Sequence, residues 1–502
     1  MSARALVAIV ALAVLGGCTG LAPPAPRDAA PDALVARCER LYVVLDEAVA
    51  AAGVPDGGEA RLAGYPYARV DRLLASFGEA PLDAAALQAW VDALIGLDRA
   101  ARRAELDNVP RSARPAVAAR LAADGWPENE PAALIEGCSR VLRDHDLADP
   151  RRRDRLLNIA RVPDDYDTWK RVVGLYVLAS FPFAYGVSRY QDGVQATFDT
   201  PLEGLPVRGT LVRYAPPEIA TLPAGEVGAI IARSSRGPLG IPRPEGEDLA
   251  RLLGAFAPVL EVDVADADDR IGYPVIGADR VPTVDVARPV AFTRVAHARV
   301  GDRVLLQLVY SFWFPARPRT SALDPLGGSL DGVTWRVTLG IDGYPVLFDS
   351  MHNCGCYHMF FPTPRAALRR QPYTIEETAF VPQRLPAAAP PDRLVLRVAS
   401  RTHYLERVTV AGRDPAGARR YGLAADETLR SIPGPDGAGH SLFRPDGIVP
   451  GTERGERWLF WPMGVREPGA MRQWGRHATA FVGRRHFDDP WLVERYFVIL
   501  EP

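Results

Sequence analysis

The segment 333–350, VTWRVTLGIDGYPVLFDS, constrains the fold more than any other part of the chain. Apolar and polar residues alternate on both sides of Asp342-Gly343, a pair that favours a two-residue β-hairpin turn. With such a turn, Val337 lies opposite Phe348, and residues directly opposite each other share a face of the hairpin. The segment therefore predicts an antiparallel sheet with one apolar, core-facing side.

The same register gives three further predictions about this hairpin. It places Leu339 opposite Val346, and Trp335 opposite Ser350, on the apolar face. On the other face it places Arg336 opposite Asp349, as an ion pair. If the second strand continues, His352 lies on the apolar face, opposite Val333.

Four side chains that can bind metals follow at every second position in HNCGCYH, namely His352, Cys354, Cys356 and His358. In a continued strand they all share the face of Trp335, so the sequence predicts a buried His/Cys site in a pocket near that tryptophan. Same-face neighbours in a straight strand are ~6.8 Å apart, so one tetrahedral ion can collect all four ligands only if the backbone curls. Gly355 is the residue at which such a curl is easiest.

Three interpretations of this site remain open. Thiolate and imidazole ligands suit zinc or copper, which makes His352, Cys354, Cys356 and His358 candidate metal ligands. A histidine that lowers a thiol pKa would instead make the cysteines a redox pair or a reactive thiol. The third interpretation is a structural Cys354–Cys356 disulfide that clips a loop, because bridges form readily outside the cytoplasm.

The pattern along the chain predicts an α+β fold. Residues 31–190 read as an α-helical domain, in which Asp83 is a plausible N-cap. Residues 191–502 read as a β-rich domain of antiparallel sheet that houses the His/Cys site. With 48% hydrophobic and 24% charged residues the chain is typical of a globular protein, and a net charge of -2 gives no footprint for nucleic acid.

The N-terminus predicts a location. A positively charged start precedes an apolar run that is too short to span a bilayer, followed by Leu15-Gly16-Gly17-Cys18. This run resembles a bacterial lipobox, which implies a lipoprotein signal peptide over 1–17 and a lipid on Cys18. Residues 18–30 then form a Pro/Ala-rich tether. The resemblance implies anchoring through acyl chains, with the outer membrane as the expected location.

The other two cysteines predict a disulfide. Cys38 and Cys138 each lie on the apolar face of a predicted helix, where two packed helices can bring the sulfurs together. A bridge between them would close a loop of about a hundred residues, worth roughly 4 kcal/mol. Two separate buried thiols are the alternative, although free thiols are less common outside the cytoplasm.

The remaining histidines and arginines predict less. His403 alternates with arginines and reads as part of a solvated edge. The arginine-rich segment 472–486 reads as a solvated surface, and a site for an anionic ligand such as a carboxylate or a phosphate headgroup is the alternative. Two classes of function are left. The β-rich part is either an enzyme or metal-handling module working through its His/Cys site, or a non-catalytic envelope protein with a stapled loop.

Overall fold

The structure is a computed structural model of the chain. It describes residues 33–500 except 128–130, 219–221, 278, 322–323, 372–373, 391, 412–416 and 435–436. The predicted signal peptide (1–17), the predicted tether (18–30) and Cys18 lie outside the described residues. None of the helices in this described part combines the length and the apolar character that a membrane span requires.

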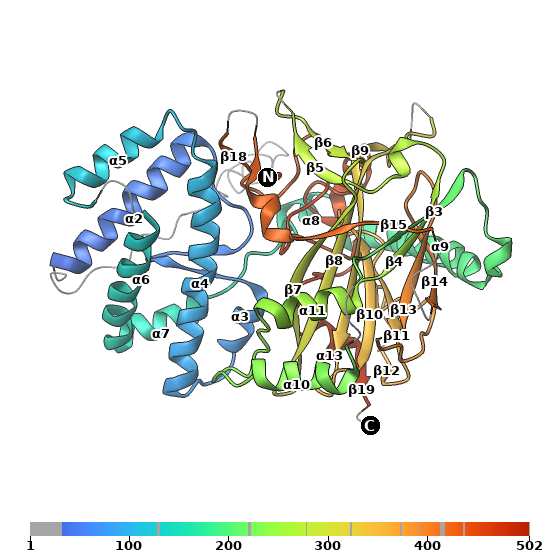
Figure 1. The fold of residues 1–502 in the computed structure, drawn as a ribbon, viewed down its shortest axis with the longest axis horizontal. Coiled ribbons are helices and arrows are strands. Elements are labelled where there is room, and N and C mark those ends of the chain that lie inside the picture. Colours follow the sequence, from blue (N-terminus) through green and yellow to red (C-terminus); the bar gives the residue numbers. More distant parts are fainter. Residues whose placement is uncertain are drawn as a thin grey trace, which may run out of the picture.

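The predicted α+β fold, helical toward the N-terminus and β-rich toward the C-terminus, is confirmed (Figure 1). The first helices are α2 (Ala33–Ala52), α3 (Arg72–Phe77), α4 (Ala84–Asn108), α5 (Arg114–Ala123), α6 (Pro131–Ala148) and α7 (Pro150–Ile159), with a short hairpin of β1 (Ala60–Leu62) and β2 (Tyr65–Val70) between α2 and α3. Helices α8 (Thr168–Val173) and α9 (Tyr176–Asp199) follow, and the predicted domain boundary at residue 190 lies inside α9.

The first helices pack around an apolar core of their own. Asp83 is the N-cap of α4, as predicted, because its side chain accepts a hydrogen bond from the Ala86 backbone N–H at 2.8 Å. Trp90 of α4 is fully buried in this core. Cys38 of α2 and Cys138 of α6 form a disulfide, as the sequence predicted, with their Cα atoms 5.1 Å apart.

Two sheets form the second part of the molecule. The larger has the strand order β11-β10-β9-β8-β7-β16, and the smaller has the order β14-β13-β4-β3-β15. Their strands are β3 (Thr210–Ala215), β4 (Val259–Val264), β7 (Val290–Val300), β8 (Arg303–Arg317), β9 (Gly328–Leu339), β10 (Pro345–His352), β11 (Met359–Pro362), β13 (Arg393–Val398), β14 (Leu405–Ala411), β15 (Arg419–Arg420) and β16 (Gly422–Ala425).

Shorter elements surround the sheets. The helices are α10 (Ala224–Ser234), α11 (Gly246–Phe256), α12 (Arg457–Phe460) and α13 (Leu492–Tyr496), and the 3₁₀ turns are η1 (Leu202–Gly204), η2 (Ala267–Asp269), η3 (Asp426–Arg430) and η4 (Trp461–Met463). Two-stranded ladders pair β5 (Tyr273–Ile276) with β6 (Pro282–Asp285), β12 (Ala366–Leu368) with β19 (Phe497–Ile499), and β17 (Ile432–Pro433) with β18 (Gly439–His440).

One face of the larger sheet carries the main core. Trp335 is fully buried there and stacks on Phe348, with ring centroids 5.6 Å apart. Leu396 and Val408 of the smaller sheet and Phe198 of α9 belong to the same apolar cluster. The two sheets and α9 are therefore held together by one core.

The opposite face of the larger sheet is also buried, and around Arg336 and Asp349 its buried side chains include an ion pair. The predicted ion pair of Arg336 and Asp349 is present, with Nε and Oδ1 2.9 Å apart. The Arg336 guanidinium also donates to the Phe487 carbonyl at 2.6 Å. The segment 472–487 thus covers this face, and the prediction that it is a solvated surface is wrong for Arg472 and Arg485, which are 3% exposed.

The β9–β10 hairpin confirms most of the predicted register. Val337 pairs with Phe348, Trp335 with Ser350, and Val333 with His352. The turn itself differs from the prediction, because Gly340 pairs with Tyr344 and leaves three loop residues, with Gly343 at φ +87°. Leu339 consequently lies opposite Pro345 instead of Val346.

A β-bulge at Val346 explains why the rest of the register survives. The ladder shifts between Pro345 and Leu347, so β10 contains one extra residue at that point. A one-residue slip reverses the face of every side chain that follows it. The longer turn causes one such slip and the bulge causes a second, so together they restore the predicted faces. Beyond the bulge, the side chains of β10 therefore face the predicted sides.

A buried ion network joins the helical part to the sheets. Arg69 of β2 is fully buried, and its guanidinium lies 3.1 Å from Asp98 and 2.9 Å from Glu105. Next to it, Arg430 reaches from the C-terminal part and donates to Asp56 at 2.6 Å. Since unpaired buried charges are costly, this network fixes the two parts of the molecule in one orientation.

Candidate functional site

The segment 352–358 is a hairpin turn and not a continuing strand. The backbone N–H of His352 donates to the Cys356 carbonyl at 3.0 Å, and that of Gly355 donates to the His352 carbonyl at 2.7 Å. Strand β11 then returns, with Met359 opposite Ser350. The prediction that alternation continues through His358 is therefore wrong, whereas the curl at Gly355, at φ +92°, is confirmed.

The turn places the two predicted histidines on opposite faces of the sheet. His352 shares the face of Trp335, as predicted, with Nδ1 3.5 Å from Oδ1 of Asp331. His358 shares the other face, where Nε2 lies 2.9 Å from Oδ2 of Asp349. Burial lowers the pKa of both imidazoles, that of His358 to about 4, so both rings are neutral at physiological pH.

The turn brings the two predicted cysteines together as free thiols. The backbone N–H of Cys356 points at Sγ of Cys354, 3.5 Å away. A hydrogen bond from the Cys356 thiol lowers the pKa of Cys354, burial opposes this effect, and the positive charge of Arg454 adds to it. The same hydrogen bond, together with burial, raises the pKa of Cys356 well above its usual value.

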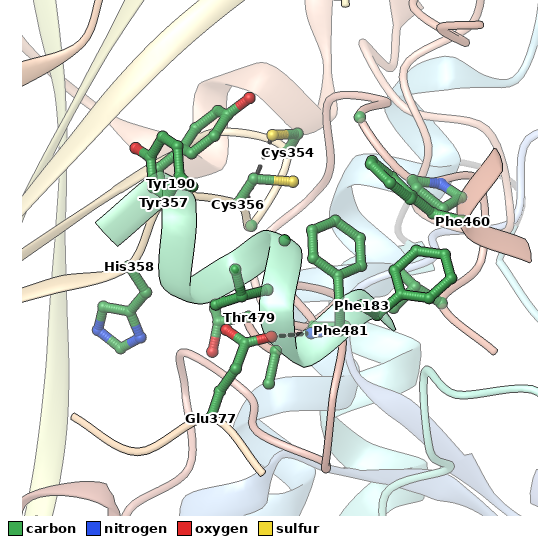
Figure 2. A pocket seen from close by; sticks show the side chains of 18 of the residues that line it. Phe183, Tyr190, Cys354, Cys356, Tyr357, His358, Glu377, Phe460, Thr479 and Phe481 are labelled. Carbon is green, nitrogen blue, oxygen red and sulfur yellow. Dashed lines mark hydrogen bonds between the residues drawn. The ribbon is translucent and has the colours of Figure 1, made fainter. Parts of the chain in front are cut away.

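Both thiols line a cavity of about 500 Å³ (Figure 2). Its other walls are mostly apolar and come from parts of the chain that are far apart in the sequence. They include Phe183, Val187 and Tyr190 of α9, Phe460 of α12, and Phe380, Thr479 and Phe481 of the loops. Figure 2 shows the cysteine side chains next to each other and the His358 imidazole apart from both. The dithiol therefore faces a space suited to an apolar ligand.

Glu456 is an ionisable group in the same cavity that the sequence did not single out. Its side chain is buried, and burial raises its pKa to about 7, against the opposing charge of Arg454. A Cβ on Gly469 would lie 1.7 Å from Oε1 of Glu456, so a side chain at residue 469 would displace this carboxyl group. Glu456 lies in the loop stretch GTERGERW, which has no periodicity that would reveal it.

A second buried ionic group lies behind His352. His403 is fully buried, with Nδ1 2.8 Å from Asp331 and Nε2 3.3 Å from Asp269, so the prediction that it belongs to a solvated edge is wrong. Burial alone would lower its pKa, but the two carboxylates raise it. Arg454 is 3.2 Å from Asp331. These charges compensate each other, so the group reads as structural support for the cysteine turn.

For metal binding, the structure brings together two of the four predicted ligands. Within the described residues, no group of three or more His, Cys, Asp or Glu side chains is arranged to hold a metal ion. Cys354 and Cys356 are the pair that could share a soft ion. In the described part of the chain, both ring nitrogens of His352 lack a hydrogen-bond partner, whereas Nε2 of His358 is engaged by Asp349.

Comparison with protein family models, with curated proteins and with solved structures finds no match to this chain. Its function is therefore inferred from the geometry of the site.

Proposed function

We propose that this chain is a lipid-anchored protein of the bacterial envelope whose functional centre is the Cys354–Cys356 dithiol. The proposed anchor is a lipid on Cys18, and the proposed location is the outer membrane, on the basis of the lipobox-like start of the chain. The dithiol acts by thiol–disulfide exchange on a ligand that enters the apolar cavity.

One observation carries this proposal: the two free thiols are in contact, and their pKa values are shifted in opposite directions. The thiolate is the nucleophile in exchange reactions, so the thiol with the lowered pKa is suited to attack. Its neighbour stays protonated and is held in place to complete the exchange.

The proposed exchange balances as follows. The Cys354 thiolate attacks one sulfur of a ligand disulfide, forms a mixed disulfide and releases the other sulfur as a thiolate. Cys356 then loses its proton and attacks Sγ of Cys354, which closes the Cys354–Cys356 bond and releases the second ligand thiolate. Two electrons pass from the dithiol to the ligand, and the two thiol protons end on the released thiols.

Glu456 is the group that we assign to proton transfer in the second step. It lines the cavity with the thiols, and its pKa of about 7 lets it both accept and return a proton near neutral pH. The steps are reversible, so the same residues would oxidise a ligand dithiol when the pair starts as a disulfide.

The proposal is tested by titrating the pair in glutathione redox buffers, with the two cysteines followed by mass spectrometry after alkylation. We expect Cys354 and Cys356 to pass between dithiol and disulfide in these buffers. A structural disulfide, with a potential below about -300 mV, would stay oxidised throughout and would contradict the proposal.

A second experiment measures the rate of iodoacetamide alkylation of Cys354 against pH in wild type and in Cys356→Ala. Removing the Cys356 thiol removes the hydrogen bond that lowers the Cys354 pKa, so the midpoint should move to higher pH. Below the midpoint, the rate should fall roughly tenfold for each pKa unit. An unchanged profile would show that Cys356 does not activate Cys354.

Metal handling is the second candidate function. It is favoured by the adjacent sulfurs and by Nε2 of His352, for which the described residues supply no hydrogen-bond partner. Metal analysis of the purified protein tests it: stoichiometric zinc or copper, lost in Cys354→Ser and Cys356→Ser, would support it. Retention of that metal in His358→Ala would separate a site on the cysteines from one that uses all four predicted ligands.

The proposed anchor has its own test. Cys18→Ala should move the protein from the membrane pellet to the soluble fraction after a carbonate wash, because the acyl chains are then missing. A variant that still pellets after the wash would contradict anchoring by this lipid.

A further inference from the structure

The chain carries a long uncharged stretch at its surface. No Asp, Glu, Lys or Arg occurs over residues 172–188, VVGLYVLASFPFAYGVS. Seven of its large apolar side chains are nevertheless exposed, from 59% for Phe181 to 75% for Val177. Scattered exposed apolar residues are ordinary, but a contiguous group of this size marks an interaction site.

Helix α9 is apolar on its inner side as well. Phe183 and Tyr190 line the cavity that holds the thiols, together with Val187 (Figure 2 shows the first two). In contrast, Val177, Leu178 and Tyr185 are exposed. The first half of α9 is therefore apolar on both sides, and a helical segment of this kind is normally buried in a protein core or in lipid. In Figure 1, α9 lies toward the end of the molecule opposite α2.

Helix α12 extends this surface. The ring of Phe460 contacts that of Phe183, with centroids 5.5 Å apart, and Trp458 is 71% exposed. We refer to the exposed side chains of Trp169, Val177, Leu178, Phe181, Tyr185 and Trp458 as the apolar face. Its two tryptophans and its tyrosine are side-chain types enriched where a bilayer meets water.

We infer that the apolar face rests on the lipid bilayer. The inference uses the proposed anchor for proximity: fourteen residues (19–32) separate Cys18 from α2 and reach at most about 50 Å, so the folded part stays close to the membrane. A helix seated in this way lies in the interface with its outer side in the acyl region.

This seat also indicates the class of ligand for the dithiol, a point that rests on the proposed function. Because α9 separates the bilayer from the cavity, a molecule that passes between them crosses only this one apolar helix. The ligand is then an apolar disulfide or dithiol dissolved in the membrane and not a folded protein domain.

The test uses a chain that begins at residue 19, which lacks the lipid but keeps every described element. Co-sedimentation with phosphatidylcholine vesicles measures the bound fraction. We expect this chain to bind, and the double variant Val177→Asp/Leu178→Asp to bind at least tenfold more weakly. Ile341→Asp is the matched control, because Ile341 is an aliphatic residue that is 54% exposed at the β9–β10 turn, and it should leave binding unchanged.

Any one of three results with vesicles would overturn the inference. They are absence of vesicle binding by the parent chain, undiminished binding by the double variant, and an equal loss of binding in Ile341→Asp. A dimer in vesicle-free sedimentation that the double variant abolishes would also overturn it, in favour of a second copy of the chain. Alkylation of Cys354 in the double variant needs no vesicles, so a failed membrane seat and a failed dithiol centre are distinguished.

Discussion

Nε2 of His358 lies 2.9 Å from Oδ2 of Asp349, on the face of the sheet opposite to that of His352. The two histidines therefore lie on opposite faces of the sheet, although the sequence predicted them on the same face. The contact also links His358 to the buried pair of Asp349 and Arg336. The same turn that parts the histidines places the two cysteines side by side in the cavity.

Asp349→Asn should destabilise the protein by about 3 kcal/mol or more, because it leaves the Arg336 guanidinium buried without its anion. The pKa of Asp349 is lowered by Arg336 and His358 against the effect of burial. Its contribution is therefore present above the unfolded pKa, near 3.8, and is lost as the pH falls through the folded pKa. Urea unfolding at several pH values measures this loss of stability. The control is Arg233→Ala, which removes a more exposed ion pair with Asp248 and should change the free energy of unfolding little.

Glu456→Gln should have the opposite effect on stability. Its folded pKa of about 7 lies above the ordinary value of 4.5. The folded state therefore loses stability as the pH rises from 4.5, and above pH 7 the full loss is reached. The amide cannot ionise, so the variant should be more stable than wild type at pH 8, by up to about 3 kcal/mol, and equal to it at pH 4. Unfolding midpoints at the two pH values check this, and equal stability at pH 8 would contradict the raised pKa.

Gly355→Ala should distort the cysteine turn. The new Cβ would lie 2.5 Å from the Ala478 carbonyl oxygen, at φ +92°, so a loss of about 2 kcal/mol or more is expected. The rate of Cys354 alkylation should also change in this variant, because the turn positions the thiol. Gly96→Ala is the control, because the Cβ meets nothing within 4 Å in helix α4 and should stabilise by up to about 1 kcal/mol.

Replacing Cys38 and Cys138 together by serine should destabilise the protein by about 4 kcal/mol, since the bridge closes a separation of 100 residues. Denaturant unfolding with and without dithiothreitol measures the effect. The reductant should lower the stability of wild type and leave that of the double variant unchanged. If the reductant lowered the stability of both proteins equally, its effect would not come from the Cys38–Cys138 disulfide.

The amino-acid sequence by itself determined the local features of this protein. Alternation fixed the buried face of Trp335 and the pairing of Val333 with His352, because side chains in a strand have a period of two. Helical spacing placed Cys38 and Cys138 on buried faces, and Asp83 indicated the N-terminus of α4 as its N-cap. Each of these depends on residues that are neighbours in the chain or in one hairpin.

Tertiary structure decided the rest. The turn after His352 is held by Arg472, whose Nε donates to the Cys354 carbonyl at 2.9 Å from 118 residues away. Glu456 and helix α9 also reach the cavity from distant parts of the chain. The burial of His403 depends on Asp269 and Asp331 in the same way. The periodicity of apolar residues in the sequence cannot predict such contacts, because the charge or backbone atom that stabilises each residue lies on another element.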